Sequence, residues 1–106
     1  MIKHLDKSTF DTTINTNDVV LVDFFADWCG PCTALHPALE ELAKEFDGKA
    51  VISKINVDTN PELAAQFKVR SIPALFYFKN GEIVGTQNGV QSKSEITSQL
   101  NNFTNN

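Results

Sequence analysis

The feature that most constrains the fold is an apolar run from Val19 to Ala26, which only Asp23 interrupts. A second run rich in apolar residues covers positions 50–57. Short runs of this kind are typical of strands that are buried on both faces of a sheet. Between the two runs, apolar residues recur at the spacing of an amphipathic helix: Leu35, Leu39, Leu42 and Phe46. A strand, a helix and a strand in this order predict a right-handed crossover between parallel strands.

Three further helix starts are expected along the chain. The segment after a short apolar strand at residues 2–5 predicts a helix capped by Ser8. Asn60 and Pro61 are suited to the cap and the first position of a second helix. The last helix follows the capping box Ser92-Lys93-Ser94-Glu95.

A β-hairpin is predicted before the last helix. Two apolar segments, residues 74–78 and 82–84, flank the pair Asn80-Gly81, which is typical of a two-residue hairpin turn. The order of elements therefore predicts an α/β fold, with a mixed β-sheet of about five strands flanked by four helices. We expect a single domain over residues 1–106.

Composition limits the classes of partner. The net charge is −4 and neither sign of charge forms a block, so we expect no nucleic-acid partner and no membrane. The first residues contain no apolar signal core, and no apolar run approaches the length of a membrane span. We therefore expect a cytoplasmic protein, and a monomer.

The chemistry is expected at Trp28-Cys29-Gly30-Pro31-Cys32, where the first buried strand meets the helix. Two thiols three positions apart lie on one helical face, close enough for a disulfide to form and break. Because only a thiolate attacks a disulfide and the positive end of a helix stabilises a thiolate, Cys29 is predicted to be the exposed attacking sulfur. Cys32, within the first turn, is predicted to be covered and to act as the resolving sulfur.

Two other interpretations of the cysteines are weaker. A structural disulfide that closes so short a loop would stabilise the fold by only about 2 kcal/mol. A zinc site normally needs four ligands, and besides the two cysteines the chain offers only His4 and His36 as further thiol or imidazole ligands. We therefore expect no metal.

Several positions outside the motif have more than one interpretation, and for one proline the sequence predicts the geometry of the preceding bond. Asp23 is either a buried general base for Cys32, with a raised pKa, or a carboxylate that reaches solvent or bonds to backbone. Lys54 is either its ionic partner or a lysine that extends to water. The bond before Pro73 is expected to be trans, because only about 5–6% of such bonds are cis. Gly85 and Gly89 mark either a β-bulge or a close approach of another backbone.

The chain resembles the thioredoxin family over its whole length. Besides the cysteine motif, the matching residues are Val22-Asp23-Phe24, Pro37, Lys54, Val57-Asp58, Asn60-Pro61, Ser71-Ile72-Pro73, Lys79-Asn80-Gly81 and Gly89. The resemblance implies the thioredoxin fold and a general protein-disulfide reductase. Such a protein binds no cofactor and uses a redox-active Cys29–Cys32 disulfide. A thioredoxin reductase would recycle it with electrons from NADPH, or ferredoxin would supply them.

The resemblance also assigns roles to the positions left open. It implies that Asp23 and Lys54 are buried together and that Pro73 is cis and faces the sulfurs. Substrate proteins would lie as extended segments against an apolar surface formed by Trp28, Gly30, Pro31, Ile72, Pro73 and Gly89. Ile72 would form backbone hydrogen bonds with the bound segment.

Three residues depart from the family pattern. Phe25 stands where many members have a second tryptophan, Thr33 where a lysine is common, and Asn88 where an apolar residue often precedes the glycine. The missing lysine is expected to weaken thiolate stabilisation slightly.

Two rival functions belong to other classes. A binding module of a larger assembly would need no cysteines. An exported oxidant or isomerase is less compatible with Gly30-Pro31, because such proteins more often carry a histidine between the cysteines.

Overall fold

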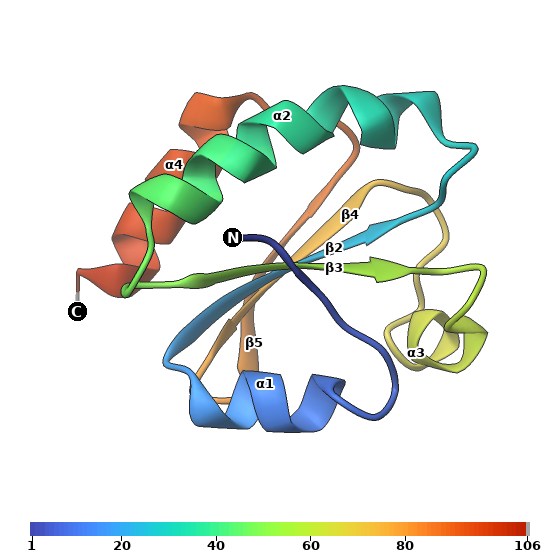
Figure 1. Cartoon of the computed structure of the whole chain (residues 1–106), viewed down its shortest axis with the longest axis horizontal. Coiled ribbons are helices and arrows are strands. Elements are labelled where there is room, and N and C mark those ends of the chain that lie inside the picture. Colours follow the sequence, from blue (N-terminus) through green and yellow to red (C-terminus); the bar gives the residue numbers. More distant parts are fainter. Residues whose placement is uncertain (106) are drawn as a thin grey trace.

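The computed structural model describes residues 1–105, so Asn106, the last residue of the predicted domain, lies outside the described part. Within that part, the predicted mixed sheet of five strands with four helices is confirmed (Figure 1). In chain order the elements are β1 (Lys3–His4), α1 (Phe10–Thr16), β2 (Val19–Phe25), α2 (Gly30–Glu45), β3 (Val51–Asn56), α3 (Pro61–Gln66), β4 (Ala74–Lys79), β5 (Glu82–Asn88) and α4 (Lys93–Thr104).

Strand β2 is the centre of the sheet. The strand order is β1-β3-β2-β4-β5, with β2 parallel to β3 and antiparallel to β4. All residues of β2 except Phe25 are buried, which agrees with its continuous apolar sequence. The carboxyl end of this strand leads directly into the cysteine motif.

Helices cover both faces of the sheet: α2 and α4 lie on one face, and α1 and α3 on the other (Figure 1). Because side chains alternate along a strand, β2 contributes to two separate cores. Val19 and Leu21 pack against α2 and α4, whereas Val20, Val22 and Phe24 pack against α1 and α3. By this alternation Asp23 lies on the face that α2 covers.

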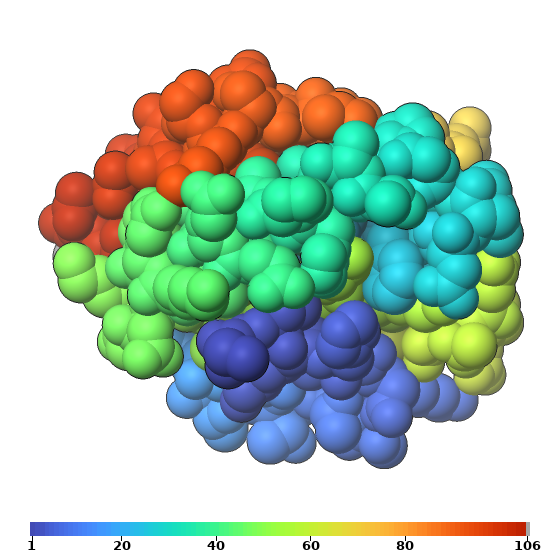
Figure 2. All heavy atoms as spheres, turned by 45° about the horizontal axis from the view of Figure 1, so that its top comes forward, coloured from blue at the N-terminus to red at the C-terminus, as the bar shows by residue number. Residues whose placement is uncertain are grey.

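On the outside, α2 runs beside α4, with the N-terminal residues on its other flank (Figure 2). Lys93, the first residue of α4, forms ion pairs with Glu41 and Glu45 of α2. These pairs are partly exposed to solvent, so each contributes little to stability. The apolar contacts beneath them provide the main packing between these helices and the sheet.

Of the three predicted N-cap residues, Asn60 and Ser92 hold that position and Ser8 does not. Helix α1 begins at Phe10 with Thr9 as its N-cap, so the assignment of Ser8 was wrong. The carboxylate of Asp6 accepts hydrogen bonds from the Ser8 hydroxyl and from the backbone N–H groups of Ser8 and Thr9, and these bonds lower the pKa of Asp6. Asn60 holds the N-cap position of α3, but its side chain donates to the Asn56 carbonyl and does not cap the helix.

The capping box before α4 and the predicted hairpin turn are both present. Ser92 accepts from the N–H of Glu95, and the Glu95 carboxylate accepts from the N–H of Ser92. Asn80 and Gly81 have φ values of 53° and 85°, the left-handed geometry that a two-residue hairpin turn requires.

Gly85 is next to an irregularity in β5. Tyr77 pairs with Gly85 and Phe78 pairs with Ile83, so Val84 is an extra residue on this strand. A Cβ atom on Gly85 would lie 3.3 Å from Cζ of Phe103. The close neighbour of this glycine is therefore a side chain of α4 and not another backbone.

No helix within residues 1–105 is both long enough and apolar enough to cross a membrane.

Candidate active site

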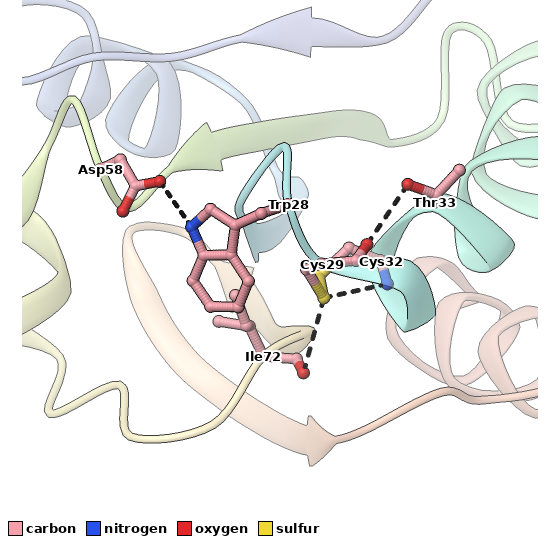
Figure 3. The surroundings of a disulfide bond; sticks show 6 residues. All are labelled: Trp28, Cys29, Cys32, Thr33, Asp58 and Ile72. Carbon is pink, nitrogen blue, oxygen red and sulfur yellow. Dashed lines mark hydrogen bonds between the residues drawn. A yellow bond between two sulfur atoms is a disulfide. The ribbon is translucent and has the colours of Figure 1, made fainter.

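The two cysteines form a disulfide at the start of α2, with a Cα–Cα distance of 5.3 Å (Figure 3). Cys29 is the N-cap residue, and Pro31 lies in the first turn, where a missing backbone donor causes no loss. The N–H of Cys32 points at Sγ of Cys29, with an N–S distance of 3.1 Å. Cys29 therefore receives a backbone donor as well as the field of the helix dipole.

The prediction that Cys29 is exposed was wrong. Cys29 is 4% exposed and Cys32 is 1% exposed, so both are buried and the predicted order is only just kept. Ala26 is buried with the two cysteines, and Ile72 packs against them from a distant segment. Because this cover comes from more than forty residues further along the chain, the local sequence gives no sign of it.

The segment before β4 approaches the disulfide through Ile72 (Figure 3). The carbonyl oxygen of Ile72 lies 3.9 Å from Sγ of Cys29, and the Ile72–Pro73 bond is cis. Gly89 donates its N–H to the carbonyl of Pro73 at 2.8 Å. Gly89 has a φ of 81°, and a Cβ atom there would meet nothing within 4 Å. Its role is therefore backbone conformation, and the predicted bulge or close approach is not found there.

Trp28 is the most exposed apolar residue beside the disulfide, with 73% of its surface exposed. Its indole N–H donates to Oδ2 of Asp58 at 2.8 Å, and the ring lies between Asp58 and the cysteines (Figure 3). Gly30 and Pro31 are exposed next to it. No role of Asp58 beyond the family match was predicted, because a contact across thirty residues has no local signal.

Asp23 is fully buried, and its two carboxylate oxygens have no hydrogen-bond partner among residues 1–105. Burial raises its pKa to about 7, while the positive charge of Lys54 acts in the opposite direction. The alternative that Asp23 reaches solvent or bonds to backbone is thereby excluded. A buried carboxyl that titrates near neutral pH is suited to proton transfer.

Lys54 is buried beside Asp23 but is not bonded to it. The two residues are register partners on β3 and β2, yet the described part of the chain contains no ion pair between them. Instead, Nζ of Lys54 lies 3.1 Å from Nδ1 of His36 and 4.3 Å from the centre of the Phe25 ring. The Lys54 ammonium therefore acts on the Asp23 carboxyl through its charge, at a longer distance than in an ion pair.

Sequence reasoning considered His36 only as a metal ligand and missed its contact with Lys54. Its Nε2 atom is 2.8 Å from Oε1 of Glu40, one helical turn further along α2. The one available signal was the spacing of four from Cys32, which places both side chains on the same side of the helix. Residues 1–105 contain no cluster of three or more His, Cys, Asp or Glu side chains that could hold a metal.

A pocket of about 320 Å³ lies beside Cys32. Its lining combines the start of α2, the end of β2 and one residue of β3: Phe25, Ala26, Asp27, Cys32, Thr33, His36, Pro37 and Lys54. Thr33 uses its hydroxyl to bond the Cys29 carbonyl at 3.2 Å, so the residue that replaces the usual lysine stabilises the first turn of α2. The pocket brings solvent close to Cys32.

Comparisons with known proteins agree with this geometry. The thioredoxin family model matches residues 1–102. The thioredoxin of Haemophilus influenzae is 45% identical over 101 residues, which cover 94% of each chain. The thioredoxin of Pyropia yezoensis is 46% identical over 98 residues, which cover 92% of each chain.

A solved structure gives the same result for the fold. A mutant thioredoxin from Halobacterium salinarum NRC-1 superposes with a TM-score of 0.91 at 38% identity, over 97% of this chain and 90% of that chain. Sequence and fold thus agree along nearly the whole length. The chain belongs to the thioredoxin family, and its Cys29–Cys32 pair is the redox-active disulfide of a protein-disulfide oxidoreductase.

Proposed function

We propose that the protein works in the direction of reduction and that Cys29 and Cys32 have distinct roles. The Cys29 thiolate attacks one sulfur of a substrate disulfide; a mixed disulfide forms and the other substrate sulfur leaves as a thiolate. Cys32 then attacks Sγ of Cys29, the Cys29–Cys32 bond forms, and the second substrate thiolate leaves. Two electrons pass to the substrate in each cycle.

The position of Cys29 supports its role as nucleophile. As the N-cap of α2, a helix of 16 residues, it lies at the positive end of the dipole, which favours the thiolate. The backbone N–H of Cys32, 3.1 Å from Sγ of Cys29 in the oxidised protein, would stabilise the same negative charge after reduction. This hydrogen-bond donor aimed at the sulfur is the observation on which the assignment chiefly rests.

Asp23 is proposed as the general base for Cys32. Its pKa of about 7 leaves a substantial fraction of carboxylate at neutral pH, and that carboxylate is basic enough to accept a thiol proton. Because its oxygens have no hydrogen-bond partner among residues 1–105, they are available for the proton. Lys54 would act on this step through its charge.

Trp28, Gly30, Pro31, Ile72, Pro73 and Gly89 are proposed as the substrate surface. Ile72 is suited to backbone pairing, because neither its N–H nor its C=O bonds to backbone within residues 1–105. An extended segment of substrate could therefore pair with the backbone of Ile72 as a short strand. The nearby Ile72 carbonyl, 3.9 Å from Sγ of Cys29, would bring the substrate disulfide to the reactive sulfur.

A thioredoxin reductase that draws on NADPH is proposed to regenerate the dithiol, with ferredoxin as the alternative source of electrons. Family membership supports this assignment, since thioredoxins generally work with such a reductase. We also propose that the protein is a cytoplasmic monomer.

Trapping of mixed disulfides tests the assignment of the two cysteines. In Cys32→Ser the nucleophile remains but nothing resolves the adduct, so mixed disulfides with substrate proteins should accumulate. Cys29→Ser is the matched control and should accumulate few. The reverse pattern would exchange the roles, and a reduction potential as oxidising as that of an exported oxidant would contradict the proposed direction.

A further inference from the structure

His36 lies between a positive and a negative charge, and each of its ring nitrogens contacts one of them. Nδ1 of His36 is 3.1 Å from Nζ of Lys54, and Nε2 is 2.8 Å from Oε1 of Glu40. An ammonium group has only protons to donate, so Nδ1 must be the acceptor. Nε2 then carries the hydrogen and donates it to Glu40. The two contacts therefore assign one tautomer to the ring, with Nδ1 as acceptor and Nε2 as donor.

The same contacts determine where the charge of Lys54 lies. Lys54 is only 5% exposed, and its ammonium rests on the face of the Phe25 ring, 4.3 Å from the ring centre. Together, Phe25 and His36 hold Nζ in the lining of the pocket beside Cys32. Asp23, the register partner of Lys54, is left with no hydrogen-bond partner within residues 1–105.

We propose that His36 is a positioning residue for proton transfer at Cys32: it accepts a hydrogen bond from Lys54 and so prevents the ammonium from pairing directly with Asp23. The inference rests on the proposed role of Asp23 as general base. An ion pair in direct contact would favour the charged form of the carboxyl and make it a weaker base. With Lys54 held by His36, the Asp23 carboxylate stays basic enough to accept a proton near neutral pH.

Other charged groups around this cluster leave the assignment unchanged. Asp27 lines the same pocket, but its hydrogen bond is from the Asn56 side chain, at 3.5 Å. His4, on β1, forms a T-shaped ring contact with Phe25, with 6.3 Å between ring centres. Within residues 1–105, His36 is the one side chain that forms a hydrogen bond with Nζ of Lys54.

The test is a titration of the Asp23 carboxyl by carbon-13 NMR in the oxidised protein, where neither cysteine titrates. In His36→Ala the acceptor is lost and Lys54 is free to turn to Asp23. The Asp23 midpoint should then fall by about one pH unit. His36→Asn restores an acceptor near the position of Nδ1 and should keep the midpoint close to that of the unmodified protein. His4→Ala is the matched control, because it removes the other histidine beside Phe25 without removing a bond to Lys54.

A double variant identifies the cause. When His36→Ala is combined with Lys54→Met, the ammonium group that could pair with Asp23 is gone. The titration midpoint of Asp23 should then not fall. An unchanged midpoint in His36→Ala would overturn the inference, and so would an equal fall in the double variant or in His36→Asn. The side chain of His36 is 39% exposed, so these variants should fold, and thermal unfolding checks this.

The titration needs no catalytic turnover, and its outcome therefore does not depend on whether Asp23 is the base. If Asp23 proves not to be the base while the midpoint still falls in His36→Ala, the proposed function fails and the positioning of Lys54 by His36 stands.

Discussion

Asp23 and Lys54 lie opposite each other on neighbouring strands, yet the ammonium group is bonded to His36 and the carboxylate oxygens have no partner within residues 1–105. Burial, which the charge of Lys54 offsets only in part, raises the pKa of Asp23 from 3.8 to about 7. Such a group favours the folded state only while it is protonated. This single relationship therefore affects both the stability of the protein and its chemistry.

The first prediction concerns stability as a function of pH. Between the unfolded pKa of 3.8 and the folded pKa of about 7, the folded state binds more protons than the unfolded state. The free energy of unfolding should therefore fall as pH rises, by roughly 2 to 3 kcal/mol between about pH 5 and pH 8. Urea unfolding of the oxidised protein measures this change. Asp23→Asn removes the titrating group and should abolish most of the slope, and an equally steep slope in that variant would contradict the prediction.

The second prediction concerns the rate of the resolving step. Without the carboxylate, Cys32 must lose its proton to solvent, so in Asp23→Asn release of reduced substrate from the mixed disulfide should slow by at least about tenfold near pH 7. The difference in rate between Asp23→Asn and the unmodified protein should become smaller at higher pH, where hydroxide deprotonates the thiol. Rapid-mixing measurement of single turnovers gives this rate. An unchanged rate at every pH would remove Asp23 from the mechanism.

The third prediction concerns the Trp28–Asp58 hydrogen bond beside the sulfurs. Trp28→Phe keeps an aromatic ring but loses the indole N–H that bonds Asp58 at 2.8 Å. The ring becomes free to move, so KM for a protein substrate should rise by roughly threefold to tenfold, the equivalent of one ordinary hydrogen bond. Reduction of a small disulfide should change little. In Asp58→Asn a side-chain acceptor remains, so the effect should be smaller. Equal effects on large and small substrates would argue against a role in protein binding.

The fourth prediction compares two glycines of the proposed substrate surface. Gly89 has a φ of 81°, where a side chain is strained, so Gly89→Ala should lower the free energy of unfolding by about 1–2 kcal/mol. Gly30 is the first residue of α2 and does not have a positive φ. A Cβ atom added there would meet nothing within 4 Å. Gly30→Ala should therefore leave stability unchanged or raise it slightly. Denaturant unfolding measures both, and an equal loss in the two variants would show that backbone conformation is not the cause.

The fifth prediction concerns the start of α4. Ser92→Ala removes one half of the capping box and should cost about 1 kcal/mol of unfolding free energy. Ser98, an exposed residue in the interior of the same helix, provides the control. Ser98→Ala should be neutral or slightly stabilising, because alanine is the better helix former. A loss in both variants would indicate a general effect of serine on this helix.

The elements could be predicted from the sequence because their signals are local. The continuous apolar run of β2 and the helical spacing of Leu35, Leu39 and Leu42 each depend on residues within one element. Asn80-Gly81 adopts its turn because of its own backbone preferences. The cap of α1 was mispredicted although it too is local, because the Ser8 hydroxyl donates to the Asp6 carboxylate and the helix begins only at Phe10.

The details of the site depend on distant contacts, which a single sequence does not encode visibly. The cover over Cys29 comes from Ile72, and the partner of Lys54 is His36, which lies 18 residues earlier in the chain. Nothing in the spacing of Asp23 and Lys54 distinguishes a contact ion pair from two buried charges that are held apart. The cis bond before Pro73 was implied by family resemblance and not by the chemistry of the dipeptide.

The central place of β2 also limits how the site can reach its substrates. A strand paired on both edges and covered on both faces opens only when most of the molecule unfolds, so its amide hydrogens should exchange among the slowest in the protein. The cysteines, attached to the end of this strand, are buried and held in place. We therefore expect a substrate to present its disulfide in a segment that can detach and extend, so that the local flexibility of the substrate determines which disulfides are reduced.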